Sequence, residues 1–186
     1  MQYSKKWLLA NKTDTTEYIF FWGHAPSNDG SIRKTCFSQW WICPFTIDGI
    51  TYPTAEHWMM AEKARLFKDE AQLANILATK KASAAKAFGR KIENFDPSLW
   101  DAQKGDIVVK GNLAKFSQHL DIQAFLLATG DKIIVEASPV DSIWGIGLAP
   151  DDPLTTQPEH WFGENLLGFA LMEVRDVLYL RIHSHP

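Results

Sequence analysis

The chain has 186 residues, of which 46% are hydrophobic and 22% charged, and its formal net charge is −3 at pH 7. A chain of this length buries a core without metal or disulfide staples, which predicts one globular domain. The slightly acidic balance argues against a broad nucleic-acid-binding surface, and no apolar run approaches the roughly 20 residues of a membrane-spanning helix.

Residues 1–10 have too short an apolar core for a signal peptide, so we expect a cytoplasmic protein without a membrane anchor. In that reducing compartment Cys36 and Cys43 are expected to be thiols, because a single C-x6-C pair is a weak zinc motif. The simplest interpretation is that both cysteines are buried and pack as small apolar residues. The 8 Trp residues fit either a packed core or a pocket wall that stacks on a flat ligand.

Residues 1–17 are polar and aperiodic, and we expect them to form a flexible lead to a domain that spans residues 18–182. Residues 18–22 and 40–47 are rich in aromatic and β-branched side chains, which predicts short, mainly antiparallel strands. The dipeptide Asp48-Gly49 predicts a hairpin turn. Gly, Pro, Ser, Asn and Asp concentrate in residues 23–35, which predicts a loop.

After Pro53 the hydrophobic period becomes helical, and Thr54 is a candidate N-cap. Residues 132–136 are predicted to form a strand, and the Pro- and Gly-rich segment after it a loop. The last helix should follow Gly163. The predicted helices cover residues 55–68, 69–79, 83–90, 98–117 and 121–129 and a C-terminal segment that ends near residue 182.

The first predicted helix carries the most informative pair of charges. On a helical wheel Glu56 and Lys63 lie in the middle of an apolar face, with Trp58, Glu62 and Arg65 opposite. The pair is two turns apart, roughly 10 Å along the axis, so both side chains could reach one point. Burying an acid and an ammonium is costly unless they pair or serve a wet pocket. The alternatives are a structural ion pair, or a hydrated Glu56 at the helix N-terminus.

A second candidate constellation lies in the long loop after residue 136. There Asp141 precedes Trp144 and Gly145, which can place a carboxylate, a stacking ring and close-approaching backbone around one ligand. The alternative is an aspartate that makes a turn and a tryptophan that fills the core.

Polar loops and one arginine complete the candidates. Asn28 and Asn165 could bind hydroxyl or phosphate oxygens, and Arg90 could form a phosphate fork. Ordinary turns, caps and a surface arginine are the simpler alternatives. The sequence contains no P-loop, dinucleotide fingerprint or metal-ligand spacing, and the tail 183–186 is too short for a metal site. We therefore expect neither a metal nor a cofactor.

Several motifs follow one another from about Tyr18 to Leu180. They are an aromatic strand with a Ser-Asn loop, Tyr52-Pro53-Thr54-Ala55-Glu56-His57 with downstream Lys63-Ala64, Phe88-Gly89-Arg90, Trp100 with Lys115-Phe116, Asp141-x-x-Trp144-Gly145-x-Gly147, and Gly163-x-Asn165-x-x-Gly168 before Leu171-Met172. Taken together, these motifs resemble the NADAR family, also called YbiA-like, and their order and spacing make chance agreement improbable.

The resemblance implies a compact, helix-rich α+β domain that hydrolyses N-glycosidic bonds of ribose derivatives. YbiA-like bacterial members act on early riboflavin-pathway intermediates, which are ribosylamino-pyrimidine phosphates. Other members remove ADP-ribose from modified bases, so ADP-ribosylated guanine in nucleic acid is an alternative to a small ribosyl or nucleotide-like substrate. The stretch from Gly23 to Trp40 is longer and more polar than in compact members, which leaves the choice of substrate open.

Motif matching assigns the family's functional residues to this chain. Glu56 would stabilise positive charge or activate water, with Asp141 as the second carboxylate and Trp144 stacking on the base. Lys63 would orient Glu56, contact a phosphate or attack C1′. The family's late asparagine falls on Asn165.

Two other functional classes compete with a hydrolase. A non-catalytic ADP-ribose or nucleotide-binding module would keep Trp144, Arg90 and the amide loops, but it would need no buried acid. A structural or assembly protein would expose a large apolar patch. The oligomeric state, and whether residues 23–35 form a lid, stay open.

Overall fold

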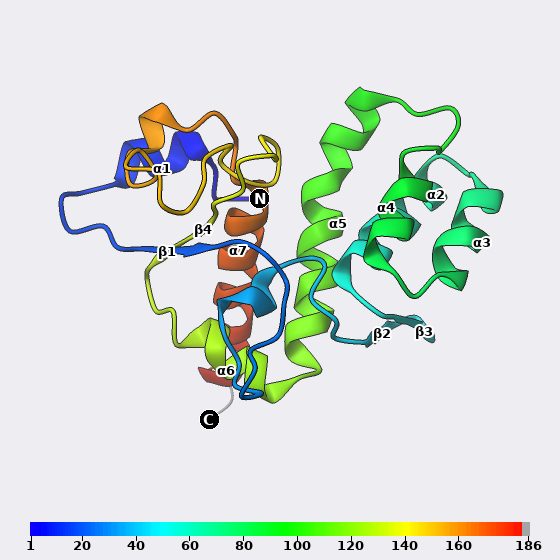
Figure 1. Cartoon of the computed structure of the whole chain (residues 1–186), viewed down its shortest axis with the longest axis horizontal. Helices are drawn as coiled ribbons and strands as arrows, with labels where there is room; N and C mark the ends of the chain where they lie inside the picture. The colour runs from blue at the N-terminus through cyan, green and yellow to red at the C-terminus, as the bar shows by residue number, and fades with distance from the viewer. Residues whose placement is uncertain (184–186) are drawn as a thin grey trace. The chain divides into compact units, whose positions relative to one another are not determined.

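The structure of the chain, a computed structural model, describes residues 1–183 (Figure 1). The expectation about a tail at 183–186 therefore falls mostly outside the described residues. Contacts divide the chain into two units. The terminal unit comprises residues 1–38 and the chain from residue 119 onward, and the central unit comprises residues 39–118.

The terminal unit is built on two paired strands, β1 and β4. They run parallel, with Tyr18 opposite Ile133 and Phe21 opposite Glu136. Parallel strands need a long crossover connection, and here more than 100 residues separate the two strands. The expectation of mainly antiparallel strands is therefore wrong for this pair. The elements of this unit are α1 (Lys5–Asn11), β1 (Tyr18–Phe21), the 3-10 helix η1 (Lys34–Phe37), α6 (Leu120–Leu127), β4 (Ile133–Glu136), the 3-10 helix η2 (Pro158–His160) and α7 (Leu166–His183).

Helix α7 packs directly on β4 because Gly168 has no side chain (Figure 1). A Cβ at this position would lie 2.0 Å from the carbonyl oxygen of Ile134, which is far inside van der Waals contact. Around this contact the buried residues Ile134, Leu171 and Val174 form part of the core. The glycine therefore sets how closely helix and strand approach.

The N-terminal segment differs from the loose lead expected for residues 1–17. Ser4 caps α1 by accepting a hydrogen bond from Trp7 N, and Leu8 is only 1% exposed. Lys5 Nζ donates to the carbonyl oxygen of Trp161 at 2.7 Å, and Tyr3 Oη lies 2.6 Å from Asp176 Oδ2. The buried Leu8 and these long-range contacts attach the N-terminal segment to the rest of the terminal unit. The polar composition of the segment gave no indication of these contacts.

The central unit begins with a hairpin and continues as a cluster of helices. Asp48 and Gly49 both adopt positive φ, 51° and 79°, as the two central residues of a type I′ turn do, so the predicted hairpin is confirmed. Its first strand starts only at Phe45, because Pro44 has no N–H for a ladder. The elements are β2 (Phe45–Ile47), β3 (Ile50–Tyr52), α2 (Ala55–Leu66), α3 (Glu70–Ala78), α4 (Ala82–Gly89) and α5 (Pro97–Ser117).

Helix α2 is the centre of this unit, and α3, α4 and α5 all pack against it (Figure 1). The wheel sets Trp58 opposite the apolar face, beside Glu62 and Arg65, yet Trp58 is buried as well. The indole is buried, its Nε1 donates to the carbonyl oxygen of Ile107 at 2.7 Å, and its ring covers Gly111 of α5. Residues 55–61, the first two turns of α2, are all buried, which a one-sided amphipathic pattern does not anticipate.

The predicted fold class, the N-cap at Thr54 and the two thiols are confirmed. The architecture is helix-rich α+β with short strands, and Thr54, Asp69 and Asp96 accept hydrogen bonds from the first turns of α2, α3 and α5. Cys36 and Cys43 are buried thiols. Among residues 1–183 the helices are too short or too polar to span a bilayer.

Candidate active site

Glu56 lies in the first turn of α2 and is almost completely buried, with 2% of its surface exposed. Thr54 caps this helix through its hydroxyl, and Glu56 N donates to the carbonyl oxygen of Gln39 at 2.9 Å. The positive end of the helix dipole favours a carboxylate at this position. Burying a carboxylate inside a helical cluster is costly unless the group is paired or serves a wet pocket, and such groups are enriched at functional sites.

Lys63 lies two turns further along α2, beside aromatic rings. Its Nζ donates to the carbonyl oxygen of Gly89 at 3.0 Å and lies 4.2 Å from the Phe95 ring centroid. Burial lowers the pKa of the Lys63 ammonium, the charge of Arg90 lowers the pKa further, and the charge of Glu56 acts in the opposite direction. The central unit therefore brings Glu56, Lys63 and Arg90 into one electrostatic cluster.

Arg90 is the exposed member of this cluster. It caps the C-terminus of α4 directly after Gly89, whose carbonyl holds Lys63. Gly89 itself packs against Met60, since a Cβ there would lie 2.0 Å from the sulfur. Two cations next to each other, one half-buried and one exposed, suit an anionic group such as a phosphate.

Sequence reasoning missed a set of buried polar side chains elsewhere in the central unit. Gln39 and Asn112 form a side-chain hydrogen bond of 2.9 Å, and Lys115 is fully buried with its Nζ 5.8 Å from the Trp41 ring centroid. The sequence did contain a pattern that indicates the burial of Asn112 and Lys115. Asn112 and Lys115 continue the stripe that starts at Val108 with a spacing of i, i+4, i+7, so both polar residues fall on the buried face of α5.

In the terminal unit Asp141 makes the turn that carries Trp144. One carboxylate oxygen, Oδ1, accepts hydrogen bonds from Ile143 N at 2.9 Å and Trp144 N at 2.8 Å. The indole of Trp144 is partly exposed. The structure thus gives Asp141 the turn-making role considered as the alternative, and this role also fixes where the Trp144 backbone lies.

Asn165 and Gly145 have structural roles, and their roles as substrate contacts stay predictions. Asn165 is 0% exposed, with Oδ1 accepting from Glu136 N and Nδ2 donating to Ile134 O, both at 2.9 Å. Its amide therefore pins the start of α7 to β4. Gly145 is buried as well, and a Cβ there would lie 2.8 Å from the carbonyl oxygen of Glu136.

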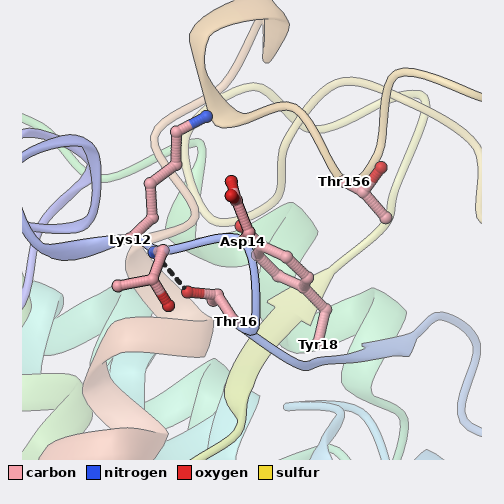
Figure 2. A pocket seen from close by; sticks show the side chains of 6 residues that line it. Lys12, Asp14, Thr16, Tyr18 and Thr156 are labelled. Carbon is pink, nitrogen blue, oxygen red and sulfur yellow. Dashed lines mark hydrogen bonds between the residues drawn. The ribbon is translucent and has the colours of Figure 1, made fainter.

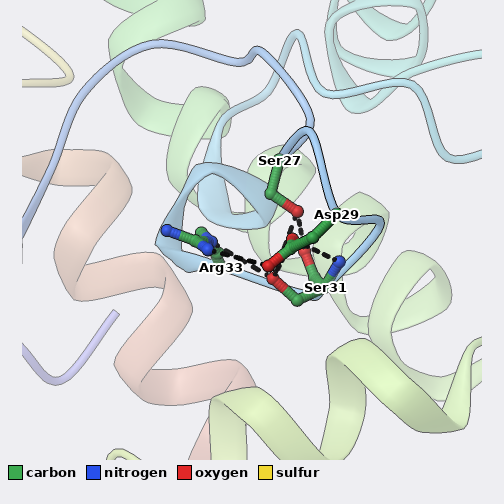
Figure 3. Close-up of polar contacts among 4 residues, drawn as sticks. All are labelled: Ser27, Asp29, Ser31 and Arg33. Carbon is green, nitrogen blue, oxygen red and sulfur yellow. Dashed lines mark hydrogen bonds and ion pairs between the residues drawn. The ribbon is translucent and has the colours of Figure 1, made fainter.

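Asn28 lies elsewhere in the terminal unit, in the loop between β1 and η1. Next to it Asp29 organises the loop, as Figure 3 shows: its carboxylate accepts from the Ser31 hydroxyl at 2.6 Å and from Arg33 Nη2 at 3.1 Å. These contacts lower the pKa of the Asp29 carboxyl, and the hydrogen bond from the Ser31 hydroxyl contributes most. Asn28 is exposed and lines a shallow hollow with Ala25, Pro26, Ser27, Asp29, Arg33 and Thr35.

A second shallow hollow lies beside the start of β1. Figure 2 shows Lys12, Asp14, Tyr18 and Thr156 around it, with Thr16 Oγ1 accepting from Thr13 N at 2.8 Å. Desolvation raises the pKa of the Tyr18 phenol. None of the residues predicted for catalysis lines this hollow.

The predicted residues thus fall into separate groups. Glu56, Lys63 and Arg90 gather in the central unit, whereas Asp141 and Trp144 share one turn of the terminal unit. Within residues 1–183 no three His, Cys, Asp or Glu side chains form a group that could hold a metal ion.

Comparison with known proteins places this arrangement in a family. The NADAR domain family model matches residues 20–179. N-glycosidase R617 of Acanthamoeba polyphaga mimivirus is 43% identical over 168 residues, which cover 88% of this chain and 97% of that protein. N-glycosidase YbiA of Escherichia coli is 34% identical over 142 residues, covering 76% of this chain and 80% of its own length.

Two further matches agree. N-glycosidase Npun_R5314 of Nostoc punctiforme is 36% identical over 141 residues, covering 76% of this chain and 83% of its own length. The NMR structure of the E. coli protein YbiA superposes with a TM-score of 0.73 at 30% identity, covering 94% of this chain and 92% of that chain. The chain therefore belongs to the NADAR domain family, and its activity class is that of an N-glycosidase, a hydrolase of N-glycosyl compounds.

Proposed function

We propose that the chain hydrolyses the bond between ribose C1′ and the base nitrogen of a small, phosphorylated ribosyl substrate in the cytoplasm. Ribosylamino-pyrimidine phosphates of riboflavin biosynthesis are the preferred class. The observation that carries the proposal is the buried carboxylate of Glu56, held at a helix N-terminus in the same electrostatic cluster as Lys63 and Arg90. A module that only bound a nucleotide would gain nothing from an acid in this position.

The reaction replaces the C1′–N bond by a C1′–O bond. As the nitrogen leaves with the bonding electrons, positive charge develops on C1′ and the ring oxygen of the ribose. Glu56 stabilises this charge and takes a proton from the attacking water, and one proton is passed on to the departing nitrogen, so that the H and OH of one water are added across the bond. The products are a free ribose phosphate and the free base amine.

Lys63 and Arg90 supply the anion-binding part of the proposal. Their charges are close enough for Arg90 to lower the pKa of Lys63, so a phosphate near both would relieve the repulsion between them. The partly exposed rings of Phe95 and Trp100 flank the Lys63 ammonium. This neighbourhood favours a phosphate contact over the other two roles considered for Lys63.

Asp141 and Trp144 keep the roles that the family resemblance implies. The partly exposed indole of Trp144 is suited to stacking on a flat base, and the hydrogen bonds from the backbone to Asp141 Oδ1 hold the turn that presents it. Asp141 Oδ2 is the oxygen of this carboxylate that is left for ribose hydroxyls or for the proton transfer.

The test is incubation of the protein with a ribosylamino-pyrimidine phosphate, followed by mass spectrometry for released ribose 5-phosphate. A parallel reaction with ADP-ribosylated guanosine in DNA distinguishes the small substrate from the nucleic-acid one. Release of ribose 5-phosphate by the wild type and its loss in Glu56→Gln support the proposal. Tight binding of the substrate without release would favour a non-catalytic module instead.

A further inference from the structure

The Gln39–Asn112 amide pair is oriented by the helix beneath it. Asn112 Nδ2 donates both to the carbonyl oxygen of Val108 and to Gln39 Oε1, each at 2.9 Å. A carbonyl oxygen only accepts hydrogen bonds, so the Asn112 side chain must point its NH2 group, and not its oxygen, toward the carbonyl oxygen of Val108. The Gln39 amide must then turn its own oxygen toward Asn112, which settles the orientation of both side chains.

This arrangement leaves one donor group and one acceptor without a protein partner. Gln39 Nε2 and Asn112 Oδ1 are buried, and neither forms a hydrogen bond with any other part of residues 1–183. Gln39 is 6% exposed and Asn112 0%. Buried polar groups in native proteins are nearly always satisfied, so an unsatisfied donor and acceptor on one amide pair call for a ligand group that both accepts and donates.

The pair is linked to the proposed catalytic residue through the backbone. The backbone oxygen of Gln39 accepts the hydrogen bond from Glu56 N at 2.9 Å. Glu56 acts at ribose C1′ in the proposed reaction, and the neighbouring substituent on the sugar is the 2′-hydroxyl. A hydroxyl accepts from an N–H and donates to a carbonyl oxygen at the same time, which is the combination that Gln39 and Asn112 leave unused.

We propose that Gln39 Nε2 and Asn112 Oδ1 bind the 2′-hydroxyl of the ribosyl substrate and select ribose over 2-deoxyribose. This inference rests on the proposed function, because it places the sugar next to Glu56. A site built to bind a hydroxyl rejects the analogue that lacks it, because the buried amide groups then stay unpaired.

The experiment compares matched sugars that differ only in this hydroxyl. Dissociation constants of ribose 5-phosphate and 2-deoxyribose 5-phosphate are measured by calorimetry, which needs no turnover. Values of kcat/KM are measured for a ribosylamino-pyrimidine phosphate and its 2′-deoxy analogue. The variants are Asn112→Leu and Gln39→Leu, each checked by thermal unfolding.

Gln118→Leu is the matched control. Gln118 caps the same helix, α5, and its amide holds both backbone groups of Thr46, at 2.9 and 2.8 Å, on the hairpin. Removing it deletes an amide with the same hydrogen-bonding capacity away from Glu56. It should leave the preference for ribose unchanged.

We expect wild type and Gln118→Leu to prefer the ribo form about tenfold or more in both measurements, since a missing partner for a buried amide usually costs at least that much. In Asn112→Leu and Gln39→Leu the preference should fall to about twofold or less. Equal binding of the two sugars by the wild type, binding of neither, or an unchanged preference in the variants would overturn the inference. If Asn112→Leu does not fold, the inference is tested by Gln39→Leu together with the preference of the wild type.

The two levels of the proposal fail differently. A wild-type protein that prefers ribose 5-phosphate but releases no base refutes the proposed function and leaves the hydroxyl site standing. A protein that hydrolyses ribo and 2′-deoxy substrates equally well refutes the hydroxyl site and leaves the proposed function standing.

Discussion

Asn165 offers the sharpest test of a structural role against a binding role. Asn165→Ala removes both hydrogen bonds from the side chain to β4, so Glu136 N–H and Ile134 C=O lose their partners inside the core. Each loss costs about 1–3 kcal/mol. Asn165 also has φ 55°, a left-handed conformation that costs an ordinary residue about 1–2 kcal/mol more. The expected loss in free energy of unfolding is therefore about 3–8 kcal/mol.

Such a loss is a large part of the roughly 5–15 kcal/mol that stabilises a typical domain. Urea unfolding followed by tryptophan fluorescence measures it. Asn165→Gly is the matched variant: it loses the same hydrogen bonds but tolerates positive φ, so it should be more stable than Asn165→Ala by about 1–2 kcal/mol. A folded Asn165→Ala protein within about 1 kcal/mol of wild type, with a KM raised severalfold, would refute the structural reasoning and restore a substrate contact.

Three further predictions concern other positions. Gly168→Ala should destabilise the fold by about 3 kcal/mol in urea unfolding, because its Cβ would lie 2.0 Å from the Ile134 carbonyl oxygen; an equally stable variant would contradict this. Since its pKa is lowered, Lys63 has a larger neutral fraction than an ordinary lysine at alkaline pH. In competitive acylation read by mass spectrometry, the pH of half-reaction of Lys63 should therefore lie below that of a lysine in an unstructured peptide. A higher value would argue against the burial of Lys63. Trp144→Ala should raise KM by about 5- to 150-fold, the worth of one stacked base, with little change in kcat; a several-hundredfold fall in kcat at constant KM would contradict it.

Local signals in the sequence predicted most elements of the fold correctly. Capping residues and a turn dipeptide mark their own positions, so the starts of α2 and α5 and the hairpin at Asp48-Gly49 agree with the structure. The parallel pairing of β1 with β4 was not predictable in this way. It joins segments more than 100 residues apart, and nothing in either strand specifies the direction of its partner.

The candidate site was predicted in part, for a related reason. Glu56 and Lys63 stand out because charges on an apolar helix face are rare, and Glu56 is indeed buried. Asn165 was assigned to the substrate because a loop asparagine before a helix suits a ligand as well as a backbone. Only the structure shows that the oxygen and the nitrogen of its side-chain amide both form hydrogen bonds with the backbone of β4. Gln39 was overlooked because its partner, Asn112, lies 73 residues away.

The central claim is that the buried carboxylate of Glu56 performs the hydrolysis, and Glu56→Gln tests it most directly. This substitution keeps the size and hydrogen bonding of the side chain but removes its charge, so kcat should fall about 10²–10⁴-fold, the usual contribution of one acid–base group. Glu62→Gln is the matched control on the same helix, because Glu62 is partly exposed and pairs with Arg65 at 2.6 Å. Both variants are compared with wild type in kcat and in thermal unfolding. The account predicts a folded, nearly inactive Glu56→Gln beside an active Glu62→Gln. A Glu56→Gln protein with near wild-type turnover would contradict it, whether or not its melting temperature had dropped.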